Sequence, residues 1–277
     1  MKTIAHISDI HFGREDPVIV EGLLEAVALA APDIIVVSGD LTQRARKKQF
    51  RAAREFLQDL PDVPQIVIPG NHDLSLTSLV DRALKPFKKY KKYITSDLEP
   101  FYTDAEVAIS GINTVRLATV NDGRIKPRVV KIACEQLEGA GTGKARVVVT
   151  HHPIDVKPGD WKQRMVSKSK EAMKHFSAIG VDLFLSGHLH VGRTIATSAR
   201  FKMKGYSAVV VHAGTAVSTR RRGQENAWNI VRVENVGPDH GIIEIQPMHW
   251  NNLAFRPMPT ERYLKGKDGW ALKESKK

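Results

Sequence analysis

Three short apolar runs decide the fold: TIAHIS at residues 3–8, DIIVVS at 33–38 and QIVI at 65–68. Their clustered Ile and Val residues, bounded by Gly, Asp or Pro, are typical of buried strands. Between them, residues 18–31 and 45–60 carry apolar residues at three- and four-residue spacing, which predicts helices. The alternating order of strand and helix predicts a mainly parallel sheet with right-handed crossovers.

The rest of the chain predicts a second sheet. Further strands are expected at residues 113–120, 146–150 and 183–186, with helices near 131–138 and 169–179. From residue 194 onward the pattern changes to consecutive strands, at 194–198, 207–212, 227–234 and 241–250. Loss of the intervening helices implies antiparallel pairing. We therefore expect an α/β fold, a four-layer αββα sandwich of two mixed sheets flanked by helices.

The composition is that of an ordinary globular protein. The 277 residues contain 42% hydrophobic and 26% charged residues, and no Pro/Gly/Ser-rich linker divides them. We expect one domain over residues 1–255, followed by a basic C-terminal tail at 256–277 that contains Trp270 and has no clear core pattern. The chain begins directly with a predicted core strand and has no apolar stretch of about 18 residues. This favours a cytoplasmic protein.

The net charge of +12 calls for an anionic partner. Phosphorylated small molecules, nucleic acid and an acidic membrane surface all fit this charge. Positive residues gather at 44–48, at 85–93 and at 220–222. Aromatic residues recur every third position within 85–93, so a basic helical cap insert around 78–95 could place an apolar stripe between cationic flanks, at the inner membrane surface. A solvated surface explains this segment equally well.

Five polar motifs follow the predicted strands. They are Asp9-Ile10-His11, Gly39-Asp40, Gly70-Asn71-His72-Asp73, His151-His152 and Gly187-His188-Leu189-His190. In open α/β sheets, ligands bind at the carboxyl ends of the strands, so these motifs should meet in one crevice. Each motif is weak alone, but all five in order predict a site for two metal ions. Carboxylate, amide and imidazole ligands without a thiolate suit manganese, iron or zinc.

These motifs resemble the blocks of the calcineurin-like metallophosphoesterases, D-x-H, G-D, G-N-H-D/E, H and G-H-x-H, over residues 4–232. The resemblance implies that one metal is held by Asp9, His11, Asp40 and His190. It implies that the other is held by Asp40, Asn71, His151 and His188. Two such cations lower the pKa of a bridging water, and the resulting hydroxide is the expected nucleophile.

The residues after Asn71 resemble the catalytic block of this family. His72 is expected to stabilise the transition state or to protonate the leaving oxygen. Asp73 could orient the His72 ring, or it could simply form a turn. His152 follows a predicted ligand and should point elsewhere, and His6 is expected to be a packed core histidine.

The opening motif, the Gly39-Asp40 block and residues 213–226 are similar to the bacterial branch that includes class III cyclic-nucleotide phosphodiesterases. The resemblance implies a phosphodiesterase acting on cyclic nucleotides or similar small phosphodiesters. Asn121 and Arg124 could line the substrate pocket, since guanidinium binds phosphate oxygens well, and His212 could border it.

Other functions stay open. The related UDP-2,3-diacylglucosamine pyrophosphohydrolases act at a membrane surface, which the basic aromatic segment favours. A catalytically inactive protein-binding scaffold would not need every metal ligand, and nucleic acid is supported by charge alone. A homodimer is compatible with the sequence.

Overall fold

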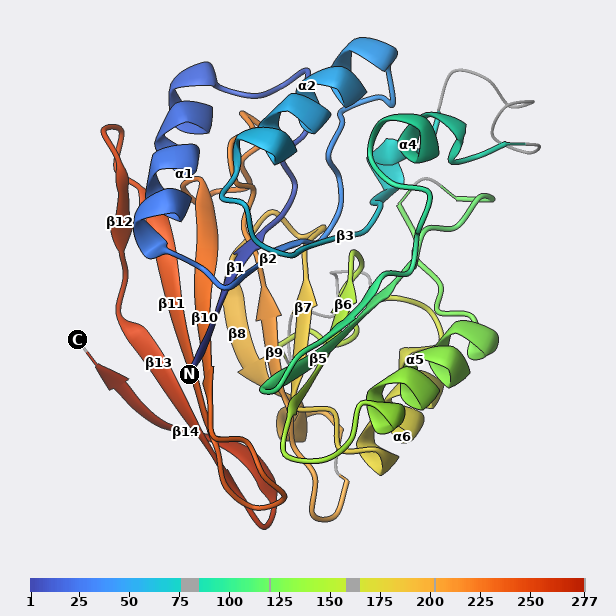
Figure 1. Cartoon of the computed structure of the whole chain (residues 1–277), viewed down its shortest axis with the longest axis vertical. Coiled ribbons are helices and arrows are strands. Elements are labelled where there is room, and N and C mark those ends of the chain that lie inside the picture. Colours follow the sequence, from blue (N-terminus) through green and yellow to red (C-terminus); the bar gives the residue numbers. More distant parts are fainter. Residues whose placement is uncertain (76–84, 120, 158–164, 202, 277) are drawn as a thin grey trace.

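Two β-sheets pack face to face between two layers of helices (Figure 1). The computed structural model describes residues 1–75, 85–119, 121–157, 165–201 and 203–276. The helices are α1 (Pro17–Ala30), α2 (Lys47–Asp59), α4 (Lys88–Tyr93), α5 (Pro127–Gly139) and α6 (Ser169–Ala178), with short 3₁₀ turns at Asn71–Asp73 and Thr197–Ala199.

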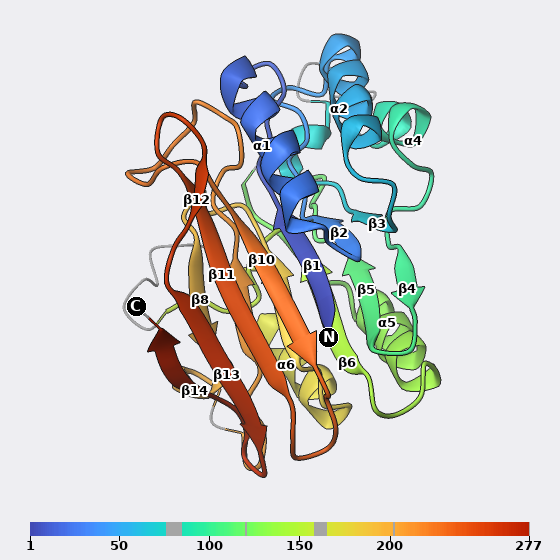
Figure 2. The same cartoon turned by 60° about the vertical axis from the view of Figure 1, so that its left-hand side comes forward.

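The first sheet has the strand order β14-β13-β11-β10-β1-β2-β3, and β12 pairs with β11 (Figure 2). Its strands are β1 (Lys2–Ile7), β2 (Ile34–Val37), β3 (Gln65–Val67), β10 (Ala227–Glu234), β11 (Ile242–Trp250), β12 (Phe255–Pro257), β13 (Thr260–Gly266) and β14 (Gly269–Lys276). β1, β2 and β3 run parallel, and β10 pairs antiparallel with β1. The sheet is therefore mixed.

The second sheet has the order β4-β5-β6-β7-β9-β8. Its strands are β4 (Phe101–Thr103), β5 (Val107–Ile112), β6 (Ala145–Thr150), β7 (Leu183–Ser186), β8 (Arg193–Ala196) and β9 (Val209–His212). β5, β6, β7 and β9 are parallel, whereas the edge strands β4 and β8 are antiparallel. This sheet is mixed as well.

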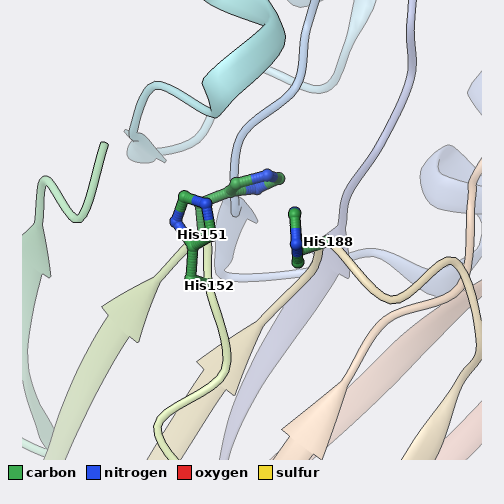
Figure 3. Close-up of side chains that lie close together, drawn as sticks. All are labelled: His151, His152 and His188. Atoms are coloured by element: carbon green, nitrogen blue, oxygen red, sulfur yellow. The ribbon is translucent and has the colours of Figure 1, made fainter. Parts of the chain in front are cut away.

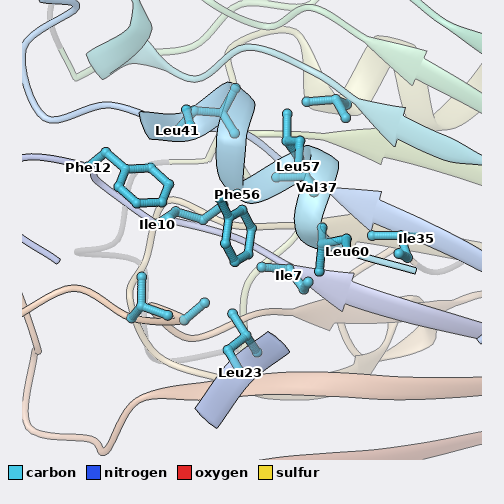
Figure 4. Close-up of a cluster of buried hydrophobic side chains, with 14 of the residues drawn as sticks. Ile7, Ile10, Phe12, Leu23, Ile35, Val37, Leu41, Phe56, Leu57 and Leu60 are labelled. Atoms are coloured by element: carbon cyan, nitrogen blue, oxygen red, sulfur yellow. The ribbon is translucent and has the colours of Figure 1, made fainter. Parts of the chain in front are cut away.

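Three hydrophobic clusters fill the three interfaces between the layers. In β2, Ile35 and Val37 join the cluster under α1 and α2, shown in Figure 4, whereas Ile34 and Val36 face the second sheet. A third cluster lies between the second sheet and the helices α5 and α6. Because strand side chains alternate between faces, a strand covered on both sides must be apolar throughout, as β2 is. The expected four-layer αββα sandwich is confirmed.

One expected strand lies elsewhere. Residues 113–119, predicted as part of a strand, follow the end of β5, which occupies residues 107–112, while residue 120 is outside the described residues. Ser110 and Gly111 interrupt the apolar pattern of β5. A Cβ atom on Gly111 would lie 2.8 Å from Ile68 and 2.9 Å from Pro100, so this strand needs a glycine for close packing.

The C-terminal residues are not a tail outside the core. Residues 255–276 form β12, β13 and β14 and extend the first sheet. Trp270 is only 2% exposed, and its Nε1 donates to Asp182 Oδ1 at 2.9 Å. Lys265 Nζ lies 2.6 Å from the same oxygen. Because Asp182 directly precedes β7, these contacts join the end of the chain to the second sheet.

The aromatic residues of the basic segment face the protein interior. Tyr90 in α4 is fully buried, and its hydroxyl donates to the Val67 carbonyl at 3.1 Å. Phe87 is 8% exposed, and the Tyr93 ring stacks on Phe50 of α2 at 6.3 Å. The expected helix exists at Lys88–Tyr93, but its aromatic stripe packs on the core and is not free to meet a membrane. Residues 78–84 of the expected cap lie outside the described residues.

Among the described residues, no helix combines the length and the apolar character needed to span a bilayer.

Candidate metal centre

The polar motifs lie at one edge of both sheets, where buried strands end. The motifs after β1, β2 and β3 come from the first sheet, and those after β6 and β7 come from the second. The structure brings together every side chain that the sequence analysis assigned to metals. They are Asp9, His11, Asp40, Asn71, His151, His188 and His190, and all except the partly exposed His188 are buried.

The backbone at these motifs adopts the left-handed conformation. Five of the expected ligands have φ angles between 52° and 71°, namely Asp9, His11, Asp40, His188 and His190. This conformation costs a residue with a side chain on the order of 1–3 kcal/mol and persists only where the surroundings enforce it. These five are half of the ten such residues in the described part of the chain. Backbone strain is therefore concentrated at this site.

Two glycines allow the motifs to approach one another. A Cβ atom on Gly70 would overlap Asp40 Oδ1, and one on Gly187 would overlap Ser8 Oγ. Any larger residue at either position would therefore push apart two loops that carry expected ligands.

One group of side chains converges on Asp9. His190 Nε2 lies 3.1 Å from Asp9 Oδ1 and 3.1 Å from His11 Nε2. His11 Nε2 lies 3.6 Å from Asp9 Oδ1 and 3.7 Å from Asp40 Oδ2. Metal–ligand bonds of about 2.0–2.2 Å place neighbouring ligand atoms about 3–3.5 Å apart. The spacing of this group therefore suits ligands of a single ion.

A second group converges on Asn71. Its Oδ1 lies 3.1 Å from His151 Nε2 and 3.1 Å from His188 Nδ1. His151 Nε2 is 3.4 Å from Asp40 Oδ2, the oxygen that also faces His11 in the first group. Asp40 therefore lies between the two groups, where a bridging ligand has to be.

The histidine rings turn lone pairs toward these groups. His190 Nδ1 donates to the Arg220 carbonyl at 2.7 Å, and His151 Nδ1 donates to the Ser38 carbonyl at 2.8 Å. In each neutral ring Nε2 is then an acceptor. The Nε2 atom of His151 consequently faces another acceptor, the side-chain oxygen of Asn71. Without a metal ion, a proton on Nε2 can occupy this contact. A cation would take the place of that proton, and a carbonyl bonded to the distal nitrogen is the usual support of a metal-bound imidazole.

The charges of the site keep its carboxylates ionised. Burial opposes the ionisation of Asp40, but His151 and His72 hold the pKa of its carboxyl group well below its usual range. Burial also opposes protonation of His151, yet the Asp40 carboxylate raises the pKa of His151 to about 9. Burial and the neighbouring charge of His151 lower the pKa of His188 to about 4. Ionised carboxylates are the form that binds metal ions.

His152 lies closer to the site than the sequence suggested. Figure 3 shows His151, His152 and His188 side by side, and their ligand atoms lie within 4.8 Å of one another. The rings of His152 and His188 are 4.5 Å apart. His152 Nδ1 is 2.8 Å from Thr114 Oγ1, which holds this ring from the opposite side. His152 therefore borders the second group and supports the position of His188.

His72 stands beside the first group. Its ring meets the His11 ring edge-on at 4.9 Å, and its backbone N–H donates to Asp40 Oδ1 at 2.8 Å. Nδ1 of His72 lies 2.8 Å from the Gln43 carbonyl, to which it can only donate. Nε2 is then an acceptor and lies 3.0 Å from the Arg220 guanidinium. His72 thus reaches the site in a defined orientation.

Asp73 does not orient His72. Its carboxylate accepts hydrogen bonds from the backbone N–H groups of Leu41, Thr42 and Gly70, and from Thr42 Oγ1, at 2.9–3.1 Å. The group that meets His72 Nδ1 is a backbone carbonyl. The expected catalytic role of Asp73 is therefore corrected. Its bonds with Leu41 and Thr42 fasten the loop after β2 to the loop after β3, and its bond with Gly70 closes the turn at residues 70–73.

Arg220 is a site residue that sequence reasoning did not identify. Its carbonyl orients His190, and its guanidinium contacts His72 and, at 3.5 Å, Gln43. The sequence showed only a basic cluster at residues 220–222. Nothing in that cluster distinguishes Arg220 from the adjacent Arg221, which pairs with Glu225 at 3.2 Å.

The expected substrate contacts have different outcomes. Asn121 and Arg124 are exposed, on a segment whose Gly123 lies against the His152 ring. Their role in substrate binding stays a prediction. His212 is 1% exposed, and its Nε2 donates to the Asp155 carbonyl at 2.9 Å. The structure contradicts its expected place at a substrate pocket, because the ring is enclosed by the protein.

Known proteins share this sequence pattern. A subunit of the nuclease SbcCD from Staphylococcus saprophyticus is 29% identical over 133 residues, which are 43% of this chain and 35% of that protein. Glycerophosphodiester phosphodiesterase GpdQ from Enterobacter lignolyticus is 30% identical over 169 residues, 54% of this chain and 56% of that protein. The matches therefore span about a third and just over half of these two relatives.

The fold has solved counterparts as well. A dimetal phosphatase from Danio rerio has a TM-score of 0.60 and covers 92% of this chain and 98% of its own, at 12% identity. Residues 2–192 match the family model of the calcineurin-like phosphoesterases, which is more than half of the chain. The protein therefore belongs to the calcineurin-like phosphoesterase family.

Proposed function

We propose that this protein is a dinuclear metal-dependent phosphodiesterase that hydrolyses small phosphodiesters, with cyclic nucleotides among the substrates to be tested. The observation that carries the proposal is the position of Asp40 Oδ2 between two groups of acceptor atoms, 3.7 Å from His11 Nε2 and 3.4 Å from His151 Nε2. A carboxylate in this position can join two cations at the distance that in-line displacement at phosphorus requires.

The donor set fits two cations of the manganese, iron or zinc type. Asp9, His11, Asp40 and His190 would hold one, and Asp40, Asn71, His151 and His188 would hold the other. Such ions activate a water molecule and polarise the phosphate. In the overall hydrolysis a water oxygen bonds to phosphorus, the P–O bond to the leaving alcohol breaks, and the leaving oxygen takes up the proton that the water gives up.

The chain's own residues fix the geometry of this reaction. The carbonyls of Ser38 and Arg220 hold the imidazoles of His151 and His190 in one orientation, so that no ring has to reorganise when substrate binds. The ring of His72 stands at the edge of the site, where it can meet the substrate phosphate.

The relative GpdQ supports the choice of a diester. It is named a glycerophosphodiester phosphodiesterase and is similar to 54% of this chain. The relative from SbcCD, named as part of a nuclease, also belongs to the diester-cleaving enzymes, but it is matched over 35% of its length. A nuclease and a glycerophosphodiester phosphodiesterase both cleave phosphodiester bonds.

The hypothesis that the protein is a lipid pyrophosphohydrolase is less well supported. It relied on the aromatic residues of the basic segment, and Phe87 and Tyr90 are buried. The scaffold hypothesis is also weak, since both groups of expected ligands are intact and the left-handed backbone at five of them would serve no purpose in a binding surface.

The test is hydrolysis by manganese-loaded protein of bis-p-nitrophenyl phosphate, p-nitrophenyl phosphate, a glycerophosphodiester, cyclic AMP and UDP-2,3-diacylglucosamine, with and without detergent. We expect the aromatic diester to be cleaved faster than the monoester, without detergent. Faster cleavage of the monoester would contradict a phosphodiesterase. A strict detergent requirement would favour the lipid substrate, and diester cleavage without activity on cyclic AMP would exclude that nucleotide.

A further inference from the structure

Arg220 lies in a loop that is fixed on both sides, here called the Arg220 loop (residues 218–226). The N–H and hydroxyl groups of Thr219 donate to the Arg14 carbonyl at 2.8 and 3.0 Å. The fully buried Asn226 donates through Nδ2 to the Ser218 carbonyl at 2.9 Å. The base of the Arg220 side chain is therefore held in place before any substrate arrives.

The side chain of Arg220 points toward the expected metal ligands. Its Nη1 donates to His72 Nε2 at 3.0 Å, and the His72 ring in turn contacts the His11 ring. Gln43 Oε1 is the other side-chain partner that the structure describes, at the long distance of 3.5 Å. A guanidinium group has five N–H donors in a fork that fits phosphate oxygens, so donors remain for a ligand.

The charge of this group matters because of where it lies. Arg220 is half-buried, and water screens its charge less there than at an exposed position. During hydrolysis negative charge increases on the phosphate oxygens and on the leaving oxygen. A fixed cation beside His72 would stabilise that charge without reorganising.

We propose that Arg220 is a further catalytic residue, whose guanidinium binds a phosphate oxygen of the substrate beside His72. This assignment rests on the proposed hydrolysis of a phosphate ester. The guanidinium lies 3.0 Å from His72 Nε2 and places a fixed positive charge next to the expected position of the substrate.

A purely positioning role is the alternative. Arg220 could act only by fixing the His72 ring, and its removal would then have no effect once His72 is replaced. Direct contact with phosphate predicts the opposite, namely an effect of Arg220 that persists without His72 and that appears in the binding of inorganic phosphate as well as in turnover.

The experiment compares Arg220→Met, Arg220→Lys and the control Arg221→Met, each loaded with manganese. Arg221 is adjacent, exposed and paired with Glu225, so its replacement removes the same charge from the same loop. Metal content, kcat and KM for bis-p-nitrophenyl phosphate, and calorimetric affinity for inorganic phosphate are measured for each. The Arg220→Met change is repeated in the His72→Asn background.

We expect Arg220→Met to keep its manganese and to lower kcat about 10²- to 10³-fold, the usual effect of removing one transition-state donor. Phosphate affinity should fall about 10- to 100-fold, with or without His72, as befits a charge-assisted hydrogen bond. Arg220→Lys should recover part of both losses. Arg221→Met should match the wild type.

Unchanged phosphate affinity in Arg220→Met, or an effect that vanishes in the His72→Asn background, would overturn the assignment. Loss of manganese from both Arg220→Met and Arg220→Lys would show that the residue maintains the metal ligands and would overturn it too. If the wild-type protein binds phosphate through Arg220 but hydrolyses no ester, the proposed function fails and the catalytic role of Arg220 with it, whereas the contact of Arg220 with phosphate stands.

Discussion

Replacing Trp270 by alanine tests whether the end of the chain belongs to the core. The side chain is 2% exposed, lies in the cluster between the two sheets and donates to Asp182 Oδ1 at 2.9 Å. Removing a buried aromatic side chain costs about 3–5 kcal/mol. We therefore expect Trp270→Ala to lower the free energy of unfolding by about 4 kcal/mol. Trp270→Phe, which loses mainly the N–H donor, should cost about 1–2 kcal/mol.

The assay is thermal unfolding of the metal-loaded protein, followed by circular dichroism. An unfolding entropy of about 2.1 cal/mol/K per residue over 277 residues gives about 0.6 kcal/mol/K, so 4 kcal/mol corresponds to a decrease in Tm of about 7 °C. The matched control is Leu272→Ala, two positions along β14, where the side chain is 52% exposed. That variant should stay within about 0.5 kcal/mol of the wild type. Equal Tm values for Trp270→Ala and Leu272→Ala would refute the docking of β14 on the core.

Three further predictions concern the site and its surroundings. Asn71→Ala should lower turnover at least about 100-fold and reduce the manganese content measured by elemental analysis; wild-type turnover would contradict its place in the second group. His72→Ala should keep its manganese while turnover slows about 10²- to 10⁴-fold, and metal loss would show that its role is different. Burial lowers the pKa of His212 to about 4, so the unfolded chain binds a proton that the folded protein does not. Stability should therefore decrease as the pH falls from about 6.5 to 4, by up to about 3 kcal/mol from this residue. Urea unfolding at several pH values should show a shallower decrease in His212→Gln, and parallel curves for the two proteins would exclude this cause.

Much of the fold could be read from short apolar runs. The strand at Ile34–Val37 is covered on both faces, and a continuous run of Ile and Val is the pattern that such burial requires. The C-terminal strands carried no such signal. In Thr260–Gly266 only Tyr263 is buried, because these strands lie toward the edge of the first sheet and need few apolar residues. The composition of residues 256–277 therefore resembled that of a basic tail outside the core.

The expected ligands could be found because each follows a predicted strand, so that the topology gathers them without knowledge of side-chain contacts. Contacts between side chains of distant loops could not be found in this way. Arg220 and His72 are 148 positions apart, and their contact depends on how the Arg220 loop folds. Helical spacing likewise predicted the aromatic stripe at residues 87–93, but periodicity does not tell whether such a stripe faces a membrane or the core of the same protein.

The central position of β1 in its sheet affects how the protein is made. On one side Ile4 lies opposite Ile34 of β2, whereas on the other side Lys2 lies opposite Val233 of β10. A nascent chain that has already formed its first three strands thus keeps one backbone edge of β1 open until β10 has left the ribosome. Open edges of apolar strands are templates for mispairing and aggregation. A chaperone that shields this edge should therefore raise the yield of the folded protein without changing its final stability.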